Sequence, residues 1–212
     1  MCASVLCGGR CSALLFDVSM HPLEVLHLRR IRRRLITQAG GRVLEVGCGT
    51  GANLPFFGWE RIEQLVLVDL EFPPKLRDYA FPHAVDVQFQ RQSVEELELA
   101  DNSFDAVVFS LLFCSVADNR RGMAELHRVL RPGGRIFFIE HVLPPSRLLR
   151  TPMRAVNPLW RRLNSGCNLT RETVPLIEQT GFVIEELERS ARGVLVSGIA
   201  RKPQPAHAVP RE

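Results

Sequence analysis

Residues 44–51, with the sequence LEVGCGTG, constrain the fold of this chain more than any other stretch. The mainly apolar residues 42–46 before the turn are typical of a buried strand. Gly47, Gly49 and Gly51 follow at alternating positions, and glycine permits backbone conformations that side chains forbid. A ligand can therefore lie against the bare main chain where the strand turns into a helix. The pattern predicts a site for a nucleotide-type cofactor.

The next apolar run along the chain ends in an acid. Residues 65–68 are followed by Asp69, and a carboxylate at about this separation from a glycine turn binds ribose hydroxyls in dinucleotide folds. The spacing of Gly47, Gly49 and Ala52 also fits the looser dinucleotide fingerprint, so spacing alone leaves a nicotinamide cofactor open. A glycine-rich turn without a ligand is the other alternative, although the strand, the turn and the acid stand at the separations that a nucleotide-binding fold requires.

Composition indicates a single globular domain. With 212 residues, 46% of them hydrophobic, the chain can bury one core but lacks the length for a separate substrate domain, which weakens the nicotinamide alternative. A net charge of +4, one tyrosine and two tryptophans give little support for nucleic-acid binding. Six cysteines without paired or zinc-type spacing predict reduced thiols inside the cell and no metal site.

The ends of the chain differ in character from its body. We expect residues 1–20 to form a flexible arm, residues 21–202 to form the domain, and residues 203–212 to form a disordered tail. From Pro22 onward, apolar residues recur at helical spacing. This spacing predicts a helix that covers one edge of the sheet.

An arginine-rich run lies in this helix. Five of the six residues from Arg29 to Arg34 are arginine. Such a face can contact an anionic membrane peripherally, and the alternative is an ordinary solvated face. No apolar run reaches the length of about 18 residues that a membrane span needs. We therefore expect a cytoplasmic or peripherally membrane-associated protein, and the sequence leaves its oligomeric state open.

Strand-like and helix-like segments alternate along the body of the chain. The predicted strands cover residues 42–46, 65–69, 85–90, 104–110, 136–139, 182–188 and 194–200. The predicted helices cover residues 52–57 and beyond, 73–80, 118–130 and 171–179, the last capped by Thr170. This alternation predicts an α/β fold with an open, mostly parallel sheet wrapped on both faces by helices, in which residues 104–110 form a central strand.

Ligands of open α/β sheets bind at the carboxyl edge of the strands. The glycine turn, Asp69, Ser93, Val94 and Ser110 all follow successive predicted strands, so we expect them to meet at this edge. Residues 144–158 contain four prolines, which predict an irregular loop long enough to fold over the site as a lid or a wall for the acceptor.

Four motifs in order resemble those of the class I S-adenosylmethionine-dependent methyltransferases, in particular the branch that includes ubiquinone and menaquinone methyltransferases. Residues 44–51 resemble the first motif of that family, and Asp69 resembles its ribose-binding acid. Residues 101–105 (DNSFD) resemble its lead into the fourth strand, and residues 126–134 (LHRVLRPGG) the segment before its fifth strand. The similarity runs from about residue 40 to residue 141.

This resemblance implies a Rossmann-like fold, a doubly wound, mostly parallel seven-stranded sheet with helices on both faces and an antiparallel last strand. It also implies that S-adenosyl-L-methionine is the cofactor and S-adenosyl-L-homocysteine the product. The residues expected to bind the cofactor are Glu45, Gly47, Cys48, Gly49, Gly51, Asn53, Asp69, Leu70, Ser93, Val94 and Ser110. Ser93 and Val94 stand where the family commonly has an acid and an alanine near the adenine, and the hydroxyl can still bond to the adenine.

Stretches outside the cofactor motif are similar to methyltransferase-like proteins that methylate small alkyl thiols. They are residues 49–53 (GTGAN), 114–116 (CSV), 140–142 (EHV) and 169–173 (LTRET). The resemblance implies methyl transfer to a small, apolar acceptor such as an alkyl thiol. A phospholipid or quinone-type acceptor, and a non-catalytic subunit with the cofactor fold, remain as alternatives.

Two residues are candidates for a role on the acceptor side. His141 follows the fifth predicted strand and could take a proton, since histidine titrates near neutrality, or it could simply bond to neighbouring backbone. Asp17 could close the cofactor pocket from the arm or cap the following turn. Because a thiolate is already a strong nucleophile, positioning can supply much of the catalysis without a strong base.

Overall fold

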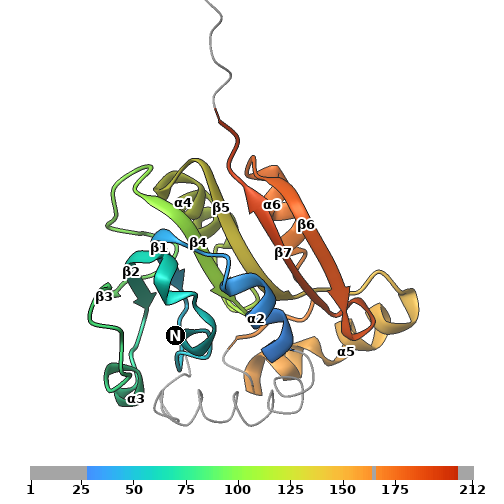
Figure 1. Cartoon of the computed structure of the whole chain (residues 1–212). Coiled ribbons are helices and arrows are strands. Elements are labelled where there is room, and N and C mark those ends of the chain that lie inside the picture. The colour runs from blue at the N-terminus through green and yellow to red at the C-terminus, as the bar shows by residue number, and fades with distance from the viewer. Residues whose placement is uncertain (1–27, 164–165, 205–212) are drawn as a thin grey trace, which may run out of the picture.

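The computed structural model describes residues 28–163 and 166–204. Within them seven strands form one sheet in the order β3-β2-β1-β4-β5-β7-β6 (Figure 1). The strands are β1 (Gly41–Val46), β2 (Ile62–Asp69), β3 (Asp86–Arg91), β4 (Phe104–Ser110), β5 (Leu130–His141), β6 (Val183–Ser190) and β7 (Leu195–Arg201). Strands β1 to β5 are parallel, and β7 pairs antiparallel with both β5 and β6. The predicted mostly parallel sheet, its central fourth strand and its antiparallel last strand are confirmed.

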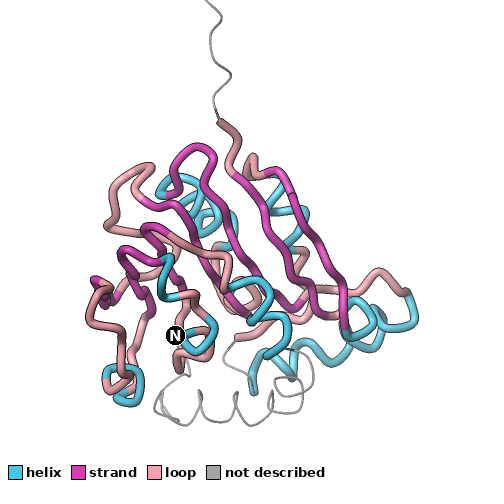
Figure 2. Tube along the Cα trace, in the orientation of Figure 1, coloured by secondary structure: helices cyan, strands magenta, loops and turns pink. Residues whose placement is uncertain are grey.

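Helices cover both faces of the sheet (Figure 2). The described helices are α2 (Arg29–Ile36), α3 (Pro74–Arg77), α4 (Asn119–Val129), α5 (Arg147–Leu163) and α6 (Thr173–Gln179). Side chains of a strand alternate between faces, so Val107 and Phe109 of β4 pack with α4 and α6, whereas Ala106 and Val108 pack with α2 and α3. The two resulting apolar layers enclose the strands and hold their carboxyl ends in register.

Helix α2 lies on a face of the sheet rather than over its edge, which corrects the prediction. Ile31 and Leu35 are buried against Ile139 of β5 and Leu195 of β7. An apolar stripe at helical spacing needs a broad apolar partner, and the face between β5 and β7 supplies one. Arg32 is buried as well, so the arginine run does not form one continuous solvated surface.

The connection between β1 and β2 contains no α-helix, contrary to the helix predicted from residue 52. It has two 3-10 turns instead, η2 (Leu54–Phe56) and η3 (Trp59–Arg61). The segment between the glycine turn and Ile62 is too short for a helix with a loop at each end. Asn53, which precedes η2, turns its side chain inward toward Glu45 instead of capping a helix.

Residues 147–163 form a helix, α5, where the prolines predicted a loop. Pro152 and Pro158 each remove a backbone donor, which weakens the helix. Contacts with the body compensate: Met153 and Trp160 pack against a buried apolar cluster, and the Asn157 side chain accepts a hydrogen bond from the backbone N–H of Leu169 at 2.8 Å. The prediction was wrong because these contacts are long-range and do not show in the proline count.

Helix α6 begins at Thr173, after Glu172, and not at residue 171 after a Thr170 cap. The hydroxyl and the backbone N–H of Thr170 both donate to the side chain of Asn168, at 2.8 and 3.0 Å. That local turn uses the groups which would otherwise begin the helix. The predicted cap of α4 is confirmed, since the Asp118 carboxylate accepts from the backbone N–H of Arg121 at 3.0 Å.

Several predictions concern residues outside the described part of the chain. These are the arm at residues 1–20 with Asp17, the beginning of the first helix at Pro22, and the tail beyond residue 204.

Candidate functional site

A cavity of about 750 Å³ opens at the carboxyl ends of β1, β2 and β4. Nine of the residues predicted to bind the cofactor line it: Gly47, Cys48, Gly49, Asn53, Asp69, Leu70, Ser93, Val94 and Ser110. Glu45 and Gly51 do not line it. The sheet therefore brings together residues spread over more than 60 positions in the sequence.

Asp69 joins the end of β2 to the glycine turn after β1. Its Oδ2 accepts a hydrogen bond from the backbone N–H of Gly49 at 2.8 Å, and its Oδ1 accepts from the N–H of Leu70 at 2.7 Å. The N–H of Gly47 donates to the carbonyl of Val68 at 2.8 Å. These bonds fix the turn, and bare backbone then lines the cavity where a side chain would fill it.

Gly49 and Gly51 both adopt left-handed backbone conformations but face different surroundings. A Cβ on Gly49 would meet nothing within 4 Å, and Gly49 lines the cavity. A Cβ on Gly51 would come within 2.5 Å of the Leu76 side chain and 2.9 Å of the Leu54 side chain. Gly49 therefore leaves room for a ligand, whereas Gly51 allows close packing of the turn itself.

This difference leads to a paired prediction. Gly51→Ala is expected to lower the free energy of unfolding by about 2 to 4 kcal/mol, because it combines backbone strain with overpacking. Gly49→Ala should cost only about 1 kcal/mol of stability, yet weaken binding of S-adenosylhomocysteine by roughly tenfold or more, since its methyl group enters the cavity. Chemical denaturation and calorimetric titration of both variants measure the two effects. If the two variants were equally stable and bound S-adenosylhomocysteine equally weakly, the roles assigned to Gly49 and Gly51 would be wrong.

A buried polar network lies behind the turn. The Asn53 side chain donates from Nδ2 to Glu45 Oε1 at 2.8 Å and to Ser110 Oγ at 3.2 Å. Burial raises the pKa of Glu45 to about 7, although the bond from Asn53 and the positive charge of Arg32 oppose the rise. Arg32 also lines the cavity. The network joins β1, the connection after β1, and β4 at the wall of the cavity.

The side of the cavity predicted for adenine is built by the segment after β3. The hydroxyl of Ser93 accepts a hydrogen bond from the N–H of Glu95 at 3.2 Å, which leaves its proton free to donate. Val94 is buried, and its side chain would be 3.2 Å from a Cβ on Gly122 of α4. A hydroxyl and an apolar wall thus meet at the place where the family commonly has an acid and an alanine.

Glu140, at the end of β5, is a residue that sequence reasoning missed. It is fully buried and accepts hydrogen bonds from the N–H groups of Leu112 at 2.8 Å and Phe113 at 3.0 Å. Burial raises its pKa to about 8 against the effect of these amides. Leu112 lines the cavity, so Glu140 holds the loop that forms one wall. An acid at the end of an otherwise apolar strand was the available signal.

Cys48 and Cys114 are poor nucleophiles, whereas the hydrogen bond with Cys114 lowers the pKa of the Cys167 thiol to about 7. Burial, reinforced by the charges of Glu45 and Asp69, raises the pKa of the Cys48 thiol far above its usual range. Cys114 is also buried, and its hydrogen bond to Cys167 together with burial raises its pKa. The thiols of Cys48 and Cys114 therefore stay protonated at neutral pH, in keeping with a packing role.

The structure does not bring His141 to the cofactor cavity, since it is not among the lining residues. Burial lowers its pKa to about 4, so the imidazole is neutral at physiological pH, and its Nδ1 has no hydrogen-bond partner. Its suggested role on the acceptor side stays a prediction. The other candidate, Asp17, lies outside the described residues.

The two buried acids predict an unusual dependence of stability on pH. Their native pKa values of about 7 and 8 lie above the ordinary value of 4.5, so they stabilise the fold fully below pH 4.5 and less as pH rises through their native pKa values. Burial of His141 lowers its pKa from 6.5 to about 4, so its contribution to stability decreases as pH falls below 6.5. A variant carrying Glu45→Gln and Glu140→Gln should therefore regain roughly 6 kcal/mol relative to wild type between pH 5 and 8. Urea denaturation at each pH measures this difference, and parallel profiles would contradict it.

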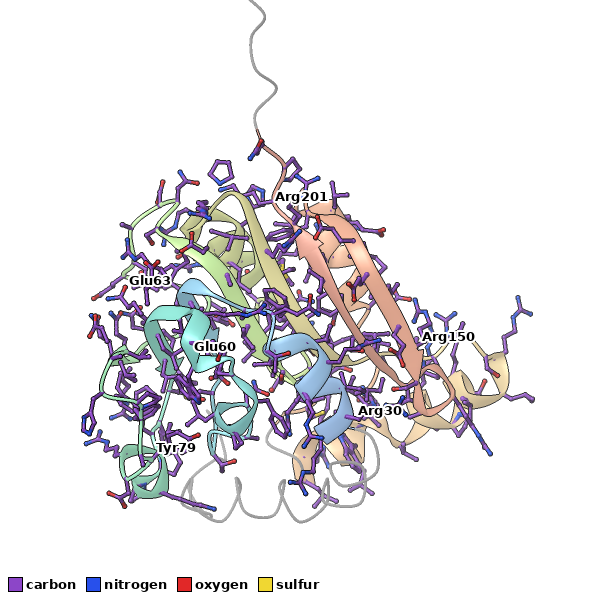
Figure 3. All side chains as sticks on the ribbon, viewed as in Figure 1. Arg30, Glu60, Glu63, Tyr79, Arg150 and Arg201 are labelled. Carbon is purple, nitrogen blue, oxygen red and sulfur yellow. The ribbon has the colours of Figure 1, made fainter. Side chains whose placement is uncertain are left out.

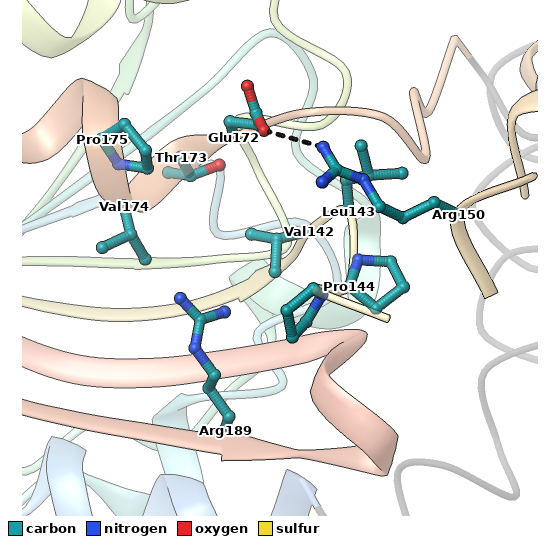
Figure 4. A pocket seen from close by; sticks show the side chains of 10 residues that line it. Val142, Leu143, Pro144, Arg150, Glu172, Thr173, Val174, Pro175 and Arg189 are labelled. Atoms are coloured by element: carbon teal, nitrogen blue, oxygen red, sulfur yellow. Dashed lines mark hydrogen bonds and ion pairs between the residues drawn. The ribbon is translucent and has the colours of Figure 1, made fainter. Parts of the chain in front are cut away.

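A second, smaller cavity of about 200 Å³ lies beyond the carboxyl end of β5 (Figure 4). Val142, Pro144 and Val174 contribute apolar walls, and Arg150 of α5 approaches Glu172 at 3.4 Å across its rim. None of the predicted site residues that the structure describes lines it. The larger cavity therefore remains the candidate for the cofactor.

The fold and the site together define a class of protein. A family model described as a methyltransferase domain matches residues 44–138, which span the glycine turn, β2, β4 and most of β5. The sheet order, the turn against Asp69 and this match place the chain in the class I S-adenosylmethionine-dependent methyltransferase family.

Among curated relatives, the chain is similar to thiol S-methyltransferases. It is 39% identical over 152 residues to thiol S-methyltransferase TMT1B of Rattus norvegicus, which covers 69% of this chain and 62% of the relative. It is 36% identical over 148 residues to thiol S-methyltransferase TMT1A of Homo sapiens, and this match covers 66% of this chain and 59% of the relative. A demethylmenaquinone methyltransferase of Deinococcus radiodurans is 36% identical over 117 residues, which cover 53% of this chain and 48% of the relative. The matched part thus spans less than two thirds of these relatives.

Solved structures with low sequence identity share the fold. An S-adenosylmethionine-dependent methyltransferase of Mesorhizobium loti superposes with a TM-score of 0.64 at 21% identity, over 80% of this chain and 95% of the other. The YcgJ protein of a Bacillus gives 0.63 at 17% identity, over 84% and 98%. Among the described residues, no helix combines the length and apolar character needed to cross a bilayer.

Proposed function

We propose that this chain transfers the methyl group of S-adenosylmethionine to a small, apolar acceptor, an alkyl thiol. The observation that carries the cofactor assignment is the cavity in which a bare glycine turn is hydrogen-bonded to Asp69. The names of the curated relatives, thiol S-methyltransferases over about 150 aligned residues, support the choice of a thiol.

The residues around the cavity fit this cofactor. Asp69 would bind the ribose hydroxyls, and the backbone at Gly47 and Gly49, with no side chains in the way, would face the amino-acid end. Ser93 and Val94 would bond to and pack on the adenine. A volume of about 750 Å³ leaves room beside the cofactor for a small acceptor.

The bound sulfonium supplies an electrophilic methyl group. The new bond joins the acceptor sulfur to the methyl carbon, the bond from that carbon to the sulfonium sulfur breaks, and its electron pair remains on that sulfur as a thioether. The thiol loses its proton to solvent water before or during attack, since a thiol is already partly ionised near neutral pH. The chain has to orient the acceptor and exclude water, and orientation alone can supply several kcal/mol of catalysis. His141 and Asp17 are the proposed acceptor-side groups.

A panel of acceptors tests this proposal. The chain is incubated with methyl-labelled S-adenosylmethionine and, separately, with alkyl thiols, quinols and amine lipids, and products are identified by mass spectrometry. The proposal predicts labelled methyl thioethers. Labelled quinol ethers or methylated amine lipids would assign the runner-up acceptors instead. Tight binding of S-adenosylhomocysteine without any product would indicate a non-catalytic subunit, and binding of NADH alone would indicate a nicotinamide enzyme.

We also propose that the arginines of α2 contact an anionic membrane peripherally, so that the protein is cytoplasmic or membrane-associated. Arg29, Arg30 and Arg33 are exposed, and Arg30 is labelled at the lower right in Figure 3. Arg34 forms an ion pair with Glu188 of β6 and Arg32 is buried, so fewer arginines are available than the sequence suggested.

A further inference from the structure

Among the described α-helices, α5 alone has no buried residue, although it is the longest of them with 17 residues. Three of its leucines face solvent, with Leu148 87%, Leu159 62% and Leu163 69% exposed. Leaving leucines in water is unfavourable by about 1.5 kcal/mol or more each. An exposed apolar stripe of this kind indicates a surface that becomes covered by another partner.

The side chains of α5 are segregated by chemistry. At 100° per residue, Leu148, Leu159 and Leu163 fall within an arc of about 60°. The helix carries five arginines and no acidic residue. Arg147, Arg150, Arg154 and Arg161 lie on the other side of the helix, whereas Arg162 lies about 40° from Leu148, at the edge of the stripe. The partner must therefore accept apolar side chains and carry negative charge close to them.

The body of the protein holds α5 in place with this stripe outward. Met153 and Trp160 pack against the buried cluster of Cys114, Cys167 and Leu169. Between these two residues, the Asn157 side chain donates a hydrogen bond to the side chain of Asn168 and accepts one from the backbone N–H of Leu169, after the end of α5. The apolar stripe is therefore presented by a packed helix and is not a consequence of a detached segment.

We propose that α5 is an interfacial helix that docks on the surface of an anionic lipid bilayer. A bilayer surface offers acyl chains beside phosphate groups, which match a leucine stripe with Arg162 at its edge and further arginines around the helix, of which only Arg150 is paired with an acid, Glu172. A protein groove would match the leucines but would need a matching set of acids for the arginines. The helix lies flat on this surface and does not cross it.

The position of α5 relates this docking to the site. The helix follows β5 at the carboxyl edge of the sheet, at the lower right in Figure 1. It packs against Cys114, and the next residue, Ser115, lines the cofactor cavity. Docking would place the acceptor side of the cavity close to lipid, where an apolar thiol dissolves. This consequence, unlike the docking itself, rests on the proposed function.

Sedimentation with vesicles tests the docking. The full chain is mixed with vesicles of phosphatidylcholine, with and without phosphatidylglycerol. The triple variant Leu148→Gln, Leu159→Gln, Leu163→Gln should lose roughly tenfold or more in partitioning to the anionic vesicles. The double variant Val183→Gln, Leu187→Gln on β6 makes the same change at exposed apolar residues elsewhere, and it should bind like wild type.

A second pair of variants tests the charge. Arg154→Gln with Arg161→Gln should weaken binding to anionic vesicles and leave the weak binding to phosphatidylcholine unchanged. Arg77→Gln with Arg120→Gln, at exposed arginines of α3 and α4, is the matched control. The variants should keep wild-type affinity for S-adenosylhomocysteine, which shows that they are folded.

Three results would overturn the docking. The wild-type chain does not sediment with anionic vesicles, or the triple leucine variant sediments as well as wild type. Alternatively, sedimentation velocity shows a dimer that the leucine variant dissociates, which would assign the stripe to a second copy of the chain. None of these measurements requires methyl transfer, so they are independent of the fate of the proposed function.

Discussion

Replacing Asp69 by alanine is expected to weaken binding of S-adenosylhomocysteine by roughly 10- to 100-fold. The change removes the proposed partner of the ribose hydroxyls. It also removes the acceptor for the N–H of Gly49, at 2.8 Å, and for the N–H of Leu70, at 2.7 Å. The glycine turn then loses the contact that fixes it against β2, and the ligand must order the turn when it binds.

Isothermal titration calorimetry measures this loss. Asp69→Asn keeps the shape and one acceptor oxygen without the charge, so its affinity should fall between wild type and Asp69→Ala. Glu63→Ala, at an exposed acid near the other end of the same strand, controls for the loss of a negative charge and should bind like wild type. Wild-type affinity in Asp69→Ala would mean that the cofactor does not use this edge of the sheet.

Glu140→Ala should produce the largest loss of stability. The alanine leaves the N–H groups of Leu112 and Phe113 without an acceptor inside the protein, and each buried unsatisfied donor costs about 1 to 3 kcal/mol. It also leaves a cavity where a fully buried side chain was. Together these effects predict a decrease of roughly 3 to 6 kcal/mol in the free energy of unfolding.

Urea denaturation followed by circular dichroism checks this value. Glu140→Gln keeps an acceptor oxygen for both amides and should lose clearly less than Glu140→Ala. Glu186→Ala, at an exposed acid of β6, should change stability by no more than about 0.5 kcal/mol. If Glu140→Ala were as stable as Glu186→Ala, the carboxylate would not be holding the loop after β4.

The parts of this protein that the sequence predicted well are those governed by local rules. Residues 104–110 read as a strand buried on both faces, and β4 has those bounds in the middle of the sheet. The glycine turn and Asp69 were predicted to meet because each ends a strand of one parallel sheet. The cavity lining includes Asp69 and the turn for that reason.

The parts that were missed depend on contacts between distant segments. Pro152 and Pro158 indicated a loop, but packing of Trp160 against the body holds a helix there. Arg32 looked like one of a solvated run, and only the docking of α2 on the sheet buries it beside the cavity. Glu140 stood out only as an acid at the end of an apolar strand, and its partners are backbone groups nearly thirty residues earlier. Periodicity and motifs carry no record of such pairings.

A crystal structure of the chain with S-adenosylhomocysteine would show where the cofactor binds. We expect the ribose hydroxyls to lie within hydrogen-bond distance of the Asp69 carboxylate, with the amino-acid end against the backbone of Gly47 and Gly49 and the adenine beside Val94. A ligand bound elsewhere, or one whose ribose makes no contact with Asp69, would contradict this expectation.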